Sequence, residues 1–307
     1  MQNFLKMKNN LAVVIPYFKI DFFKETINSL ANQTDKNFNV YIGNDASATN
    51  PEKLIDTFRE KVNITYRNFS ENLGSKSLVL QWYRCLELVQ HEEWVLFLCD
   101  DDVLDFNVVA SFYEHLNEIE AEGSSVVRFA SQVIDANGIK QSNIYKHPVK
   151  ELGFDFLERK LKGGSRSSLS EYLFNKKELL KIGIKDLPLA WYSDLLLVIE
   201  MAIYNPIFTI NQSIVFFRNS GINITSKNDN LVKKNEATFA FYFFIIENYD
   251  KRISSSFIEQ IYFRLEKTIL DNKKNINYWL KTFKLYLNKG KFTKFACIVL
   301  KALKSII

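Results

Sequence analysis

The sequence has few cysteines, no long apolar run and no recognisable leader. Three cysteines, an odd number spread over 307 residues, cannot form a disulfide framework or a four-thiolate zinc site, which favours a reducing compartment. No apolar run approaches the roughly 20 residues that span a bilayer, and the opening MQNFLKMKNN lacks the apolar core and cleavage site of a secretory signal. Internal repeats and low-complexity segments are also absent. These absences predict a cytoplasmic protein without a membrane span.

The composition is that of a folded protein whose charge is unevenly distributed. Hydrophobic residues make up 47% and charged residues 24%, which excludes intrinsic disorder, and the length allows about two domains. Residues 250–307 hold 13 Lys and Arg against 4 Asp and Glu, so this segment carries +9 and the rest carries −4. The acidic body argues against a nucleic-acid binder. The basic end suits an anionic surface such as a membrane, or is a solvated helical face.

Apolar runs alternate with helical periodicity along the first half of the chain. Alternation of this kind is typical of a parallel sheet flanked by helices, with strands expected at residues 11–16, 38–45, 62–68, 94–99 and 124–134 and helices at 22–30, 51–60, 74–89 and 106–120. Beyond these we expect a strand at 171–175, helices at 177–182 and 191–203, and a pair of strands at 206–210 and 213–218. From about residue 230 the pattern is helical. The sequence therefore predicts an α/β, Rossmann-like domain over residues 1–225 and a helical region over 226–307.

Polar residues follow the predicted strands where each strand ends. Ligands of open parallel sheets bind beyond the carboxyl ends of the strands, and here those ends carry Pro16, Tyr17, Asp45, Arg67, Asn68, Asp100, Asp101 and Asp102. Three consecutive carboxylates repel one another unless a cation lies among them. Oxygen ligands in small number favour Mg²⁺ or Mn²⁺. The alternative is that one aspartate caps the following helix, which explains one carboxylate and leaves two.

Five segments in order resemble family 2 glycosyltransferases with the GT-A fold. They are LAVVIPYF (11–18), NDAS (44–47), NLGS (72–75), LFLCDDDVL (96–104), and SLSEYLFNKKELLKIG (168–183) followed by WYSDLLL (191–197). The likeness spans roughly residues 10–225. It departs from the family pattern at Cys99, where an aspartate is common, so the choice of metal ligands among the acidic triplet stays open.

The resemblance implies roles for the residues at the strand ends. Pro16, Tyr17 and Asp45 would hold the nucleobase, usually uracil, although Asp45 also suits a plain Asx turn. Asn72 belongs to the family's Asn-x-Gly turn. Donor diphosphate would be bound through Mn²⁺ or Mg²⁺ on the DxD region, made of Asp100, Asp101 and Asp102. Lys76 is placed to reach phosphate or faces solvent.

Two later residues match the acceptor side and the closing segment of the family. Asp194 would be the general base that deprotonates the acceptor hydroxyl, with inversion at the anomeric carbon; its alternative is a helix N-cap. Arg218, in FRNSGINITS, would neutralise phosphate or is an ordinary surface arginine.

The last helix has an apolar and a basic face. Phe295, Ala296, Val299, Leu303 and Ile306 recur at helical spacing, and another face carries Lys291, Lys294 and Lys301. Such a helix lies in the headgroup region of an anionic membrane, or packs its apolar face on the catalytic domain.

These observations predict an inverting, metal-dependent glycosyltransferase. Its donor would be a nucleotide sugar, a UDP-sugar, and its acceptor a saccharide or lipid-linked saccharide in bacterial capsule or O-antigen synthesis, at the inner face of the membrane. Two alternatives remain. A sugar nucleotidyltransferase would need a glycine-rich basic loop after the first strand, which PYFKIDFF lacks. A catalytically silent scaffold of the same fold would not need the acidic triplet.

Overall fold

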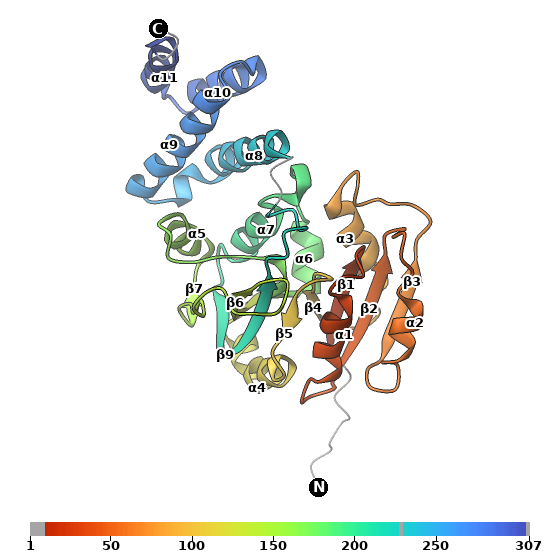
Figure 1. The fold of residues 1–307 in the computed structure, drawn as a ribbon. Coiled ribbons are helices and arrows are strands. Elements are labelled where there is room, and N and C mark those ends of the chain that lie inside the picture. The colour runs from red at the N-terminus through yellow and green to blue at the C-terminus, as the bar shows by residue number, and fades with distance from the viewer. Residues whose placement is uncertain (1–9, 227–229, 305–307) are drawn as a thin grey trace. The chain divides into compact units, whose positions relative to one another are not determined.

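The computed structural model describes residues 10–226 and 230–304. The chain divides into two compact units, one of residues 1–186 and 193–227, the other of residues 187–192 and 228–307. The first is built on a nine-stranded sheet, and the second is helical (Figure 1). This is a mixed α/β fold with a helical C-terminal region, as the sequence predicted. Among the described residues, no helix combines the length and apolarity that a membrane span needs.

The parallel half of the sheet is formed by the first part of the chain. It contains β1 (Leu11–Tyr17), β2 (Phe38–Asn44), β3 (Ile64–Asn68) and β4 (Trp94–Phe97), which run parallel in the order β3-β2-β1-β4. Every residue of β2 and β4 is buried, because helices cover both faces of the sheet. The carboxyl ends of these strands therefore share one edge, where Tyr17, Asn44 and Phe97 are the last residues.

The second half of the sheet is mixed. It contains β8 (Tyr172–Asn175), β6 (Val126–Ile134), β9 (Ile207–Arg218) and the two-residue strands β5 (Val103–Leu104) and β7 (Lys150–Glu151). Strand β8 runs antiparallel to both β4 and β6, whereas β6 and β9 are parallel. The pair of strands expected at 206–218 is one strand, because a register shift opposite Phe129 and Ala130 absorbs the polar residues that suggested a turn.

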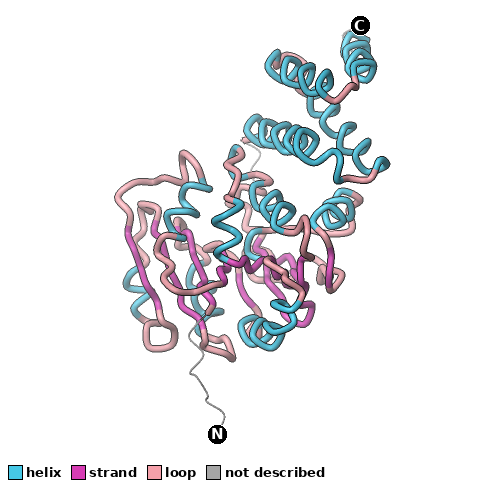
Figure 2. The backbone as a smooth tube through the Cα atoms, turned by 180° about the vertical axis from the view of Figure 1, so that it is seen from behind, coloured by secondary structure: helices cyan, strands magenta, loops and turns pink. Residues whose placement is uncertain are grey.

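Helices cover both faces of the sheet, as the magenta strands among cyan helices in Figure 2 show. Apolar side chains of α1 (Phe23–Ala31), α2 (Glu52–Asp56) and α4 (Val108–Ala121) form one core with alternate residues of β1. Helix α3 (Leu78–Leu86) packs on the other face, where Trp82 contacts Phe97 and Cys85 lies so close to Gly43 that a side chain there would collide with it. Helix α3 begins later than expected, since Ser77 caps it and residues 74–77 form a turn.

Three further helices of the first unit follow the sheet strands in sequence. They are α5 (Gly153–Leu161), α6 (Lys176–Ile182) and α7 (Ser193–Met201), with the short 3₁₀ helix η1 (Leu169–Glu171) directly before β8. Helix α7 packs against both α5 and α6. This arrangement places the first turn of α7 and the end of α5 in the same part of the unit.

The second unit consists of the 3₁₀ helices η2 (Pro188–Ala190) and η3 (Asp250–Arg252) and four long helices. The latter are α8 (Leu231–Tyr249), α9 (Ser255–Asp271), α10 (Ile276–Asn288) and α11 (Phe292–Lys304). Its core is aromatic: Tyr192 stacks on Phe241, and Phe239 stacks on Tyr278.

The lysines of the basic face expected for α11 are paired with carboxylates of α9 in the structure. Lys291 and Lys294 pair with Glu259 of α9, and Lys294 and Lys301 lie 3.9 and 3.7 Å from Glu266. These three lysines therefore stabilise the helical unit internally instead of forming a free basic face. Ile306 lies outside the described residues.

Candidate functional site

The acidic loop after β4 is fixed to the end of β1 by Asp100. Its Oδ2 accepts hydrogen bonds from the backbone N–H groups of Phe18 and Lys19, both at 2.7 Å. Burial raises the pKa of Asp100, and these two hydrogen bonds oppose that rise. Asp100 thus ties together the carboxyl ends of two neighbouring parallel strands.

Asp102 is anchored from the opposite side of the loop. It is fully buried, and its Oδ1 accepts from the backbone N–H of Arg218 at 2.9 Å while its Oδ2 accepts from Ser170 Oγ at 2.5 Å. Burial raises the pKa of Asp102 to about 6, against the hydrogen bonds that favour its ionised form. A carboxylate held this way has one orientation, which a metal ligand requires.

Asp101 lies between these two anchored residues and has the most perturbed pKa of the three. Burial and the carboxylates of Asp102 and Asp100 raise its pKa to about 8. Cys99 Sγ and one oxygen each of Asp101 and Asp102 lie within 4.8 Å of one another. Burial keeps the Cys99 thiol protonated by raising its pKa, so the two carboxylates are the hard ligands. The donor set fits one divalent cation of the Mg²⁺ or Mn²⁺ type.

At the end of β2, Asp45 holds the turn that contains Asn72. Its Oδ1 accepts from the N–H of Leu73 at 2.7 Å and its Oδ2 from the N–H of Gly74 at 2.9 Å. Arg84 of α3 adds an ion pair at 2.6 Å. Burial nevertheless raises the pKa of Asp45, since it outweighs the hydrogen bonds and the guanidinium. Asn72 itself forms an Asx turn with the N–H of Ser75.

The other expected donor residues lie around the same sheet edge. Tyr17 is buried, and its hydroxyl donates to the carbonyl of Thr49 at 2.8 Å, which holds the loop after β2. Pro16 is half-buried beside it. Lys76 is exposed and lies 3.8 Å from Glu71. The structure thus brings the ends of β1, β2 and β4 and the turn at 72–75 to one edge, as the sequence predicted.

Arg218 has a position that the sequence did not predict. Its side chain is fully buried, and its guanidinium donates to the carbonyl oxygens of Asp101, Asp135 and Ala136 at 2.9, 3.1 and 3.2 Å. It also pairs with Glu25. With four of its five N–H donors engaged within the protein, Arg218 supports the acidic loop through the carbonyl of Asp101.

Asp194 lies in the first turn of α7, half-buried. Burial raises the pKa of its carboxyl to about 6, Lys160 opposes that rise and Glu171 adds to it. Lys160 is half-buried and forms no ion pair with any residue in the described part of the chain; burial lowers its pKa. An ionisable carboxylate with a pKa near 6 suits a general base near neutral pH.

Several residues of the site carry no sequence signal of their own. Ser170 and Glu171 belong to the segment 168–183, which the resemblance covers without giving these two residues a role, and Arg166 lies just before that segment. Glu171 is fully buried and accepts from Arg166 at 2.7 Å and from Ser168 at 2.8 Å. The pairing of Arg84 with Asp45 was not predicted either, because an arginine inside a helix belongs to no sequence motif. Only the pairing of distant segments reveals these contacts.

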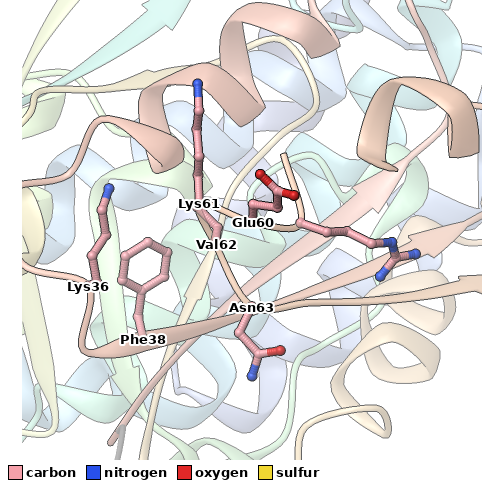
Figure 3. A pocket seen from close by; sticks show the side chains of 7 residues that line it. Lys36, Phe38, Glu60, Lys61, Val62 and Asn63 are labelled. Atoms are coloured by element: carbon pink, nitrogen blue, oxygen red, sulfur yellow. The ribbon is translucent and has the colours of Figure 1, made fainter. Parts of the chain in front are cut away.

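One hollow at the sheet lies away from this site. A pocket of about 250 Å³ is lined by residues just before β2 and β3, at the amino ends of the parallel strands. Figure 3 shows the side chains of Lys36 and Lys61 on either side of Phe38. Three of its polar side chains already have partners within the protein: Lys36 donates to the carbonyl of Ala31, Arg59 to Asp56 and Asn63 to Asn39.

Comparisons with known proteins agree with the fold. The family model "Glycosyl transferase family 2" matches residues 12–180. The chain therefore belongs to glycosyl transferase family 2. No protein of curated function matches the sequence.

Solved structures of S. aureus TarS share the fold. Full-length TarS has a TM-score of 0.61 at 17% identity, over 85% of this chain and 43% of TarS, so the chain spans less than half of that protein. TarS 1-349 in complex with UDP-GlcNAc has a TM-score of 0.61 at 17% identity, over 93% of this chain and 79% of that one. The complex of TarS 1-349 with UDP has a TM-score of 0.53 at 15% identity, over 96% and 92%.

Proposed function

We propose that the chain is an inverting glycosyltransferase that takes its sugar from a UDP-sugar donor. The observation that carries the proposal is the pair of carboxylates of half-buried Asp101 and buried Asp102, at the carboxyl edge of the sheet next to the turn held by Asp45. Membership of family 2 supports the reaction class. The likeness to TarS, solved in complex with UDP-GlcNAc, supports a UDP-linked donor.

In this proposal Asp101 and Asp102 hold Mg²⁺ or Mn²⁺. Bound there, the metal neutralises the charge that develops on the departing diphosphate. We assign the ligand roles to Asp101 and Asp102 because one oxygen of each lies within 4.8 Å of the other and of Cys99 Sγ, whereas Asp100 fixes the loop to β1 through its Oδ2. This assigns the ligands within the triplet.

The nucleobase end is formed by Asp45, Pro16 and Tyr17. A carboxylate has about four acceptor sites, and Asp45 uses three of them for Leu73, Gly74 and Arg84. The remaining site on Oδ2 accepts the ring N–H of uracil. Asn72 shapes the turn beside it. Lys76, exposed on that turn, swings to the diphosphate and leaves its distant ion pair with Glu71.

Asp194 is the general base. Its carboxylate takes the proton of the acceptor hydroxyl as that oxygen attacks the anomeric carbon from the face opposite the diphosphate. The bond between the anomeric carbon and the phosphate oxygen breaks, and UDP leaves with the electron pair, so the configuration inverts. With a pKa of about 6, Asp194 is ionised at neutral pH and protonated below.

The acceptor is a saccharide or a lipid-linked saccharide of a bacterial surface polysaccharide. The loop of residues 162–168, which follows α5 and precedes η1, is short and polar. It contains Arg166, which pairs with Glu171. Binding residues are often found on such loops, carried by a rigid scaffold. We assign acceptor recognition to this loop.

Calorimetric titration with UDP, GDP and dTDP, with and without Mn²⁺, tests the donor site. We expect UDP alone to bind, in a metal-dependent way, and Asp101→Asn to abolish that binding while Asp186→Asn, an exposed control, preserves it. Asp194→Asn should bind UDP normally yet lose transfer. Absence of nucleotide binding would favour a silent scaffold, and full transfer by Asp194→Asn would exclude it as the base.

A further inference from the structure

Helices α10 and α11 expose an apolar surface that nothing in the proposed reaction requires. On α10, Ile276, Leu280, Phe283 and Leu287 recur at spacings of four, three and four residues, which places them on one side of the helix. Their exposed fractions range from 38% for Phe283 to 72% for Ile276. The opposite side of α10 is already used, because Tyr278, Thr282, Leu285 and Tyr286 are buried. Helix α10 therefore has two apolar faces, and only one of them has a place in the core.

Helix α11 continues the same surface. Phe292, Leu300 and Leu303 are each more than half exposed, whereas Ile298 and Ala302 are buried. Phe283 of α10 lies against Phe295 of α11, with ring centroids 5.2 Å apart. Because Phe283 belongs to the exposed stripe of α10, this contact brings that stripe next to α11. In Figure 1 both helices are drawn in blue at the C-terminal end of the chain.

We call this the α10–α11 surface. It comprises Ile276, Leu280, Phe283, Leu287, Phe292, Leu300 and Leu303. Exposed apolar side chains that gather on neighbouring helices often mark an interaction site.

The charge around this surface is of one sign. After Asp271 the sequence contains nine lysines and no acidic residue. Lys289, Lys291, Lys294 and Lys301 lie close to acidic residues of η3 and α9. Four others are exposed and form no ion pair with a described residue, namely Lys274, Lys281, Lys284 and Lys304. The apolar stripes are therefore accompanied by lysines that have no counter-charge within residues 10–226 and 230–304.

We propose that the α10–α11 surface binds an anionic lipid bilayer, with its apolar side chains in the headgroup region and its unpaired lysines on the lipid phosphates. An apolar face with lysine at its border and no carboxylate has the chemistry of an interfacial helix pair. A second copy of the chain fits less well, because it would bring two strongly basic segments together. The proposal is independent of the transferase reaction.

Flotation of the full chain with lipid vesicles tests this. Vesicles of phosphatidylcholine mixed equally with phosphatidylglycerol should carry the protein, and vesicles of phosphatidylcholine alone should not. Leu280→Asp and Leu300→Asp should each weaken binding about tenfold or more, since a buried leucine is lost and a negative charge gained. Lys281→Gln and Lys284→Gln should each weaken it about fivefold, and added salt should weaken it further.

The controls share the residue type but lie elsewhere. Leu180→Asp and Lys177→Gln change equally exposed residues of α6 and should leave vesicle binding unchanged. Both target leucines are more than half exposed, so the fold should persist, and far-UV circular dichroism checks this. Equal binding by wild type and Leu280→Asp would overturn the proposal. Wild-type protein that does not float with anionic vesicles would also overturn it. So would a wild-type dimer, detected by light scattering, that Leu280→Asp dissociates.

Discussion

Substitution of Arg218 separates two roles that the sequence and the structure give this residue. A phosphate-binding arginine contributes to donor affinity and little to stability. A buried arginine that satisfies carbonyl groups contributes mainly to stability. In the structure, the guanidinium is fully buried and donates to the carbonyl oxygens of Asp101, Asp135 and Ala136. Arg218→Met retains much of the stem but removes every donor.

The size of the effect follows from those contacts. A buried polar group left without its hydrogen bond costs about 1–3 kcal/mol. The substitution removes the donor of the Asp101 and Ala136 carbonyl groups, while the carbonyl of Asp135 keeps the N–H of Gly138. The partner Glu25 is 55% exposed, so that ion pair adds little. Loss of the guanidinium from above the Phe22 ring, 4.6 Å away, adds a smaller amount. We therefore expect the free energy of unfolding to fall by about 3–5 kcal/mol, a large share of ordinary domain stability.

Urea titration followed by far-UV circular dichroism measures this change. Arg67→Met is the matched control, because Arg67 is an exposed arginine at the end of β3, and it should change stability by less than about 0.5 kcal/mol. If Arg218→Met lowers the free energy of unfolding by less than about 1 kcal/mol and also weakens UDP binding, the supporting role is refuted. Arg218 would then be a phosphate-binding residue.

Three further predictions concern titration and close packing. Lys160→Gln removes the positive charge that lowers the pKa of Asp194, so the acid limb of the pH–activity profile should move up by roughly half to one unit. Gly74→Ala would place a Cβ 2.5 Å from Asp45 Oδ2, and we expect UDP binding to weaken about tenfold in calorimetry. Burial raises the pKa of Asp101 to about 8, so Mn²⁺ binding near neutral pH should release a proton, and affinity should fall as the pH drops below that value.

Each of these predictions has a control and a contradicting result. Lys162→Gln changes an exposed lysine paired with Glu158 and should leave the pH–activity profile unchanged. An unshifted profile for Lys160→Gln would contradict the effect of the Lys160 charge on the pKa of Asp194. Gly164→Ala, whose Cβ would meet nothing closer than 3.3 Å, should bind UDP normally. Binding heats that do not depend on the ionisation enthalpy of the buffer would contradict proton release.

Much of the fold could be predicted because its signals are local. Buried parallel strands read as continuous apolar runs, so β1, β2 and β4 were predicted to within two residues. The acidic loop was placed at the ligand-binding edge because it directly follows such a run. Errors arose where tertiary contacts override local pattern, as in β9, whose polar residues resemble a turn and are absorbed as a register shift against β6.

The site was predicted less completely, because its residues act through partners far away in sequence. Arg218 and Asp102 are 116 positions apart, and no local pattern says that the first is buried beneath the loop of the second. Arg84 meets Asp45 across 39 positions for the same reason. A sequence indicates which residues have suitable chemistry; which of their atoms are already occupied depends on long-range packing.

The metal end and the base end of the site meet in the 3₁₀ helix η1. Ser170 donates to Asp102, and its neighbour Glu171 has a charge that raises the pKa of both Asp102 and Asp194. Because these two residues are adjacent and fully buried, the position of one fixes the position of the other. In the proposal, the helix η1 therefore holds one of the metal ligands, Asp102, and also fixes the Glu171 charge that acts on the proposed base, Asp194. In the proposed reaction, donor binding and acceptor activation are therefore coupled through this one turn of backbone.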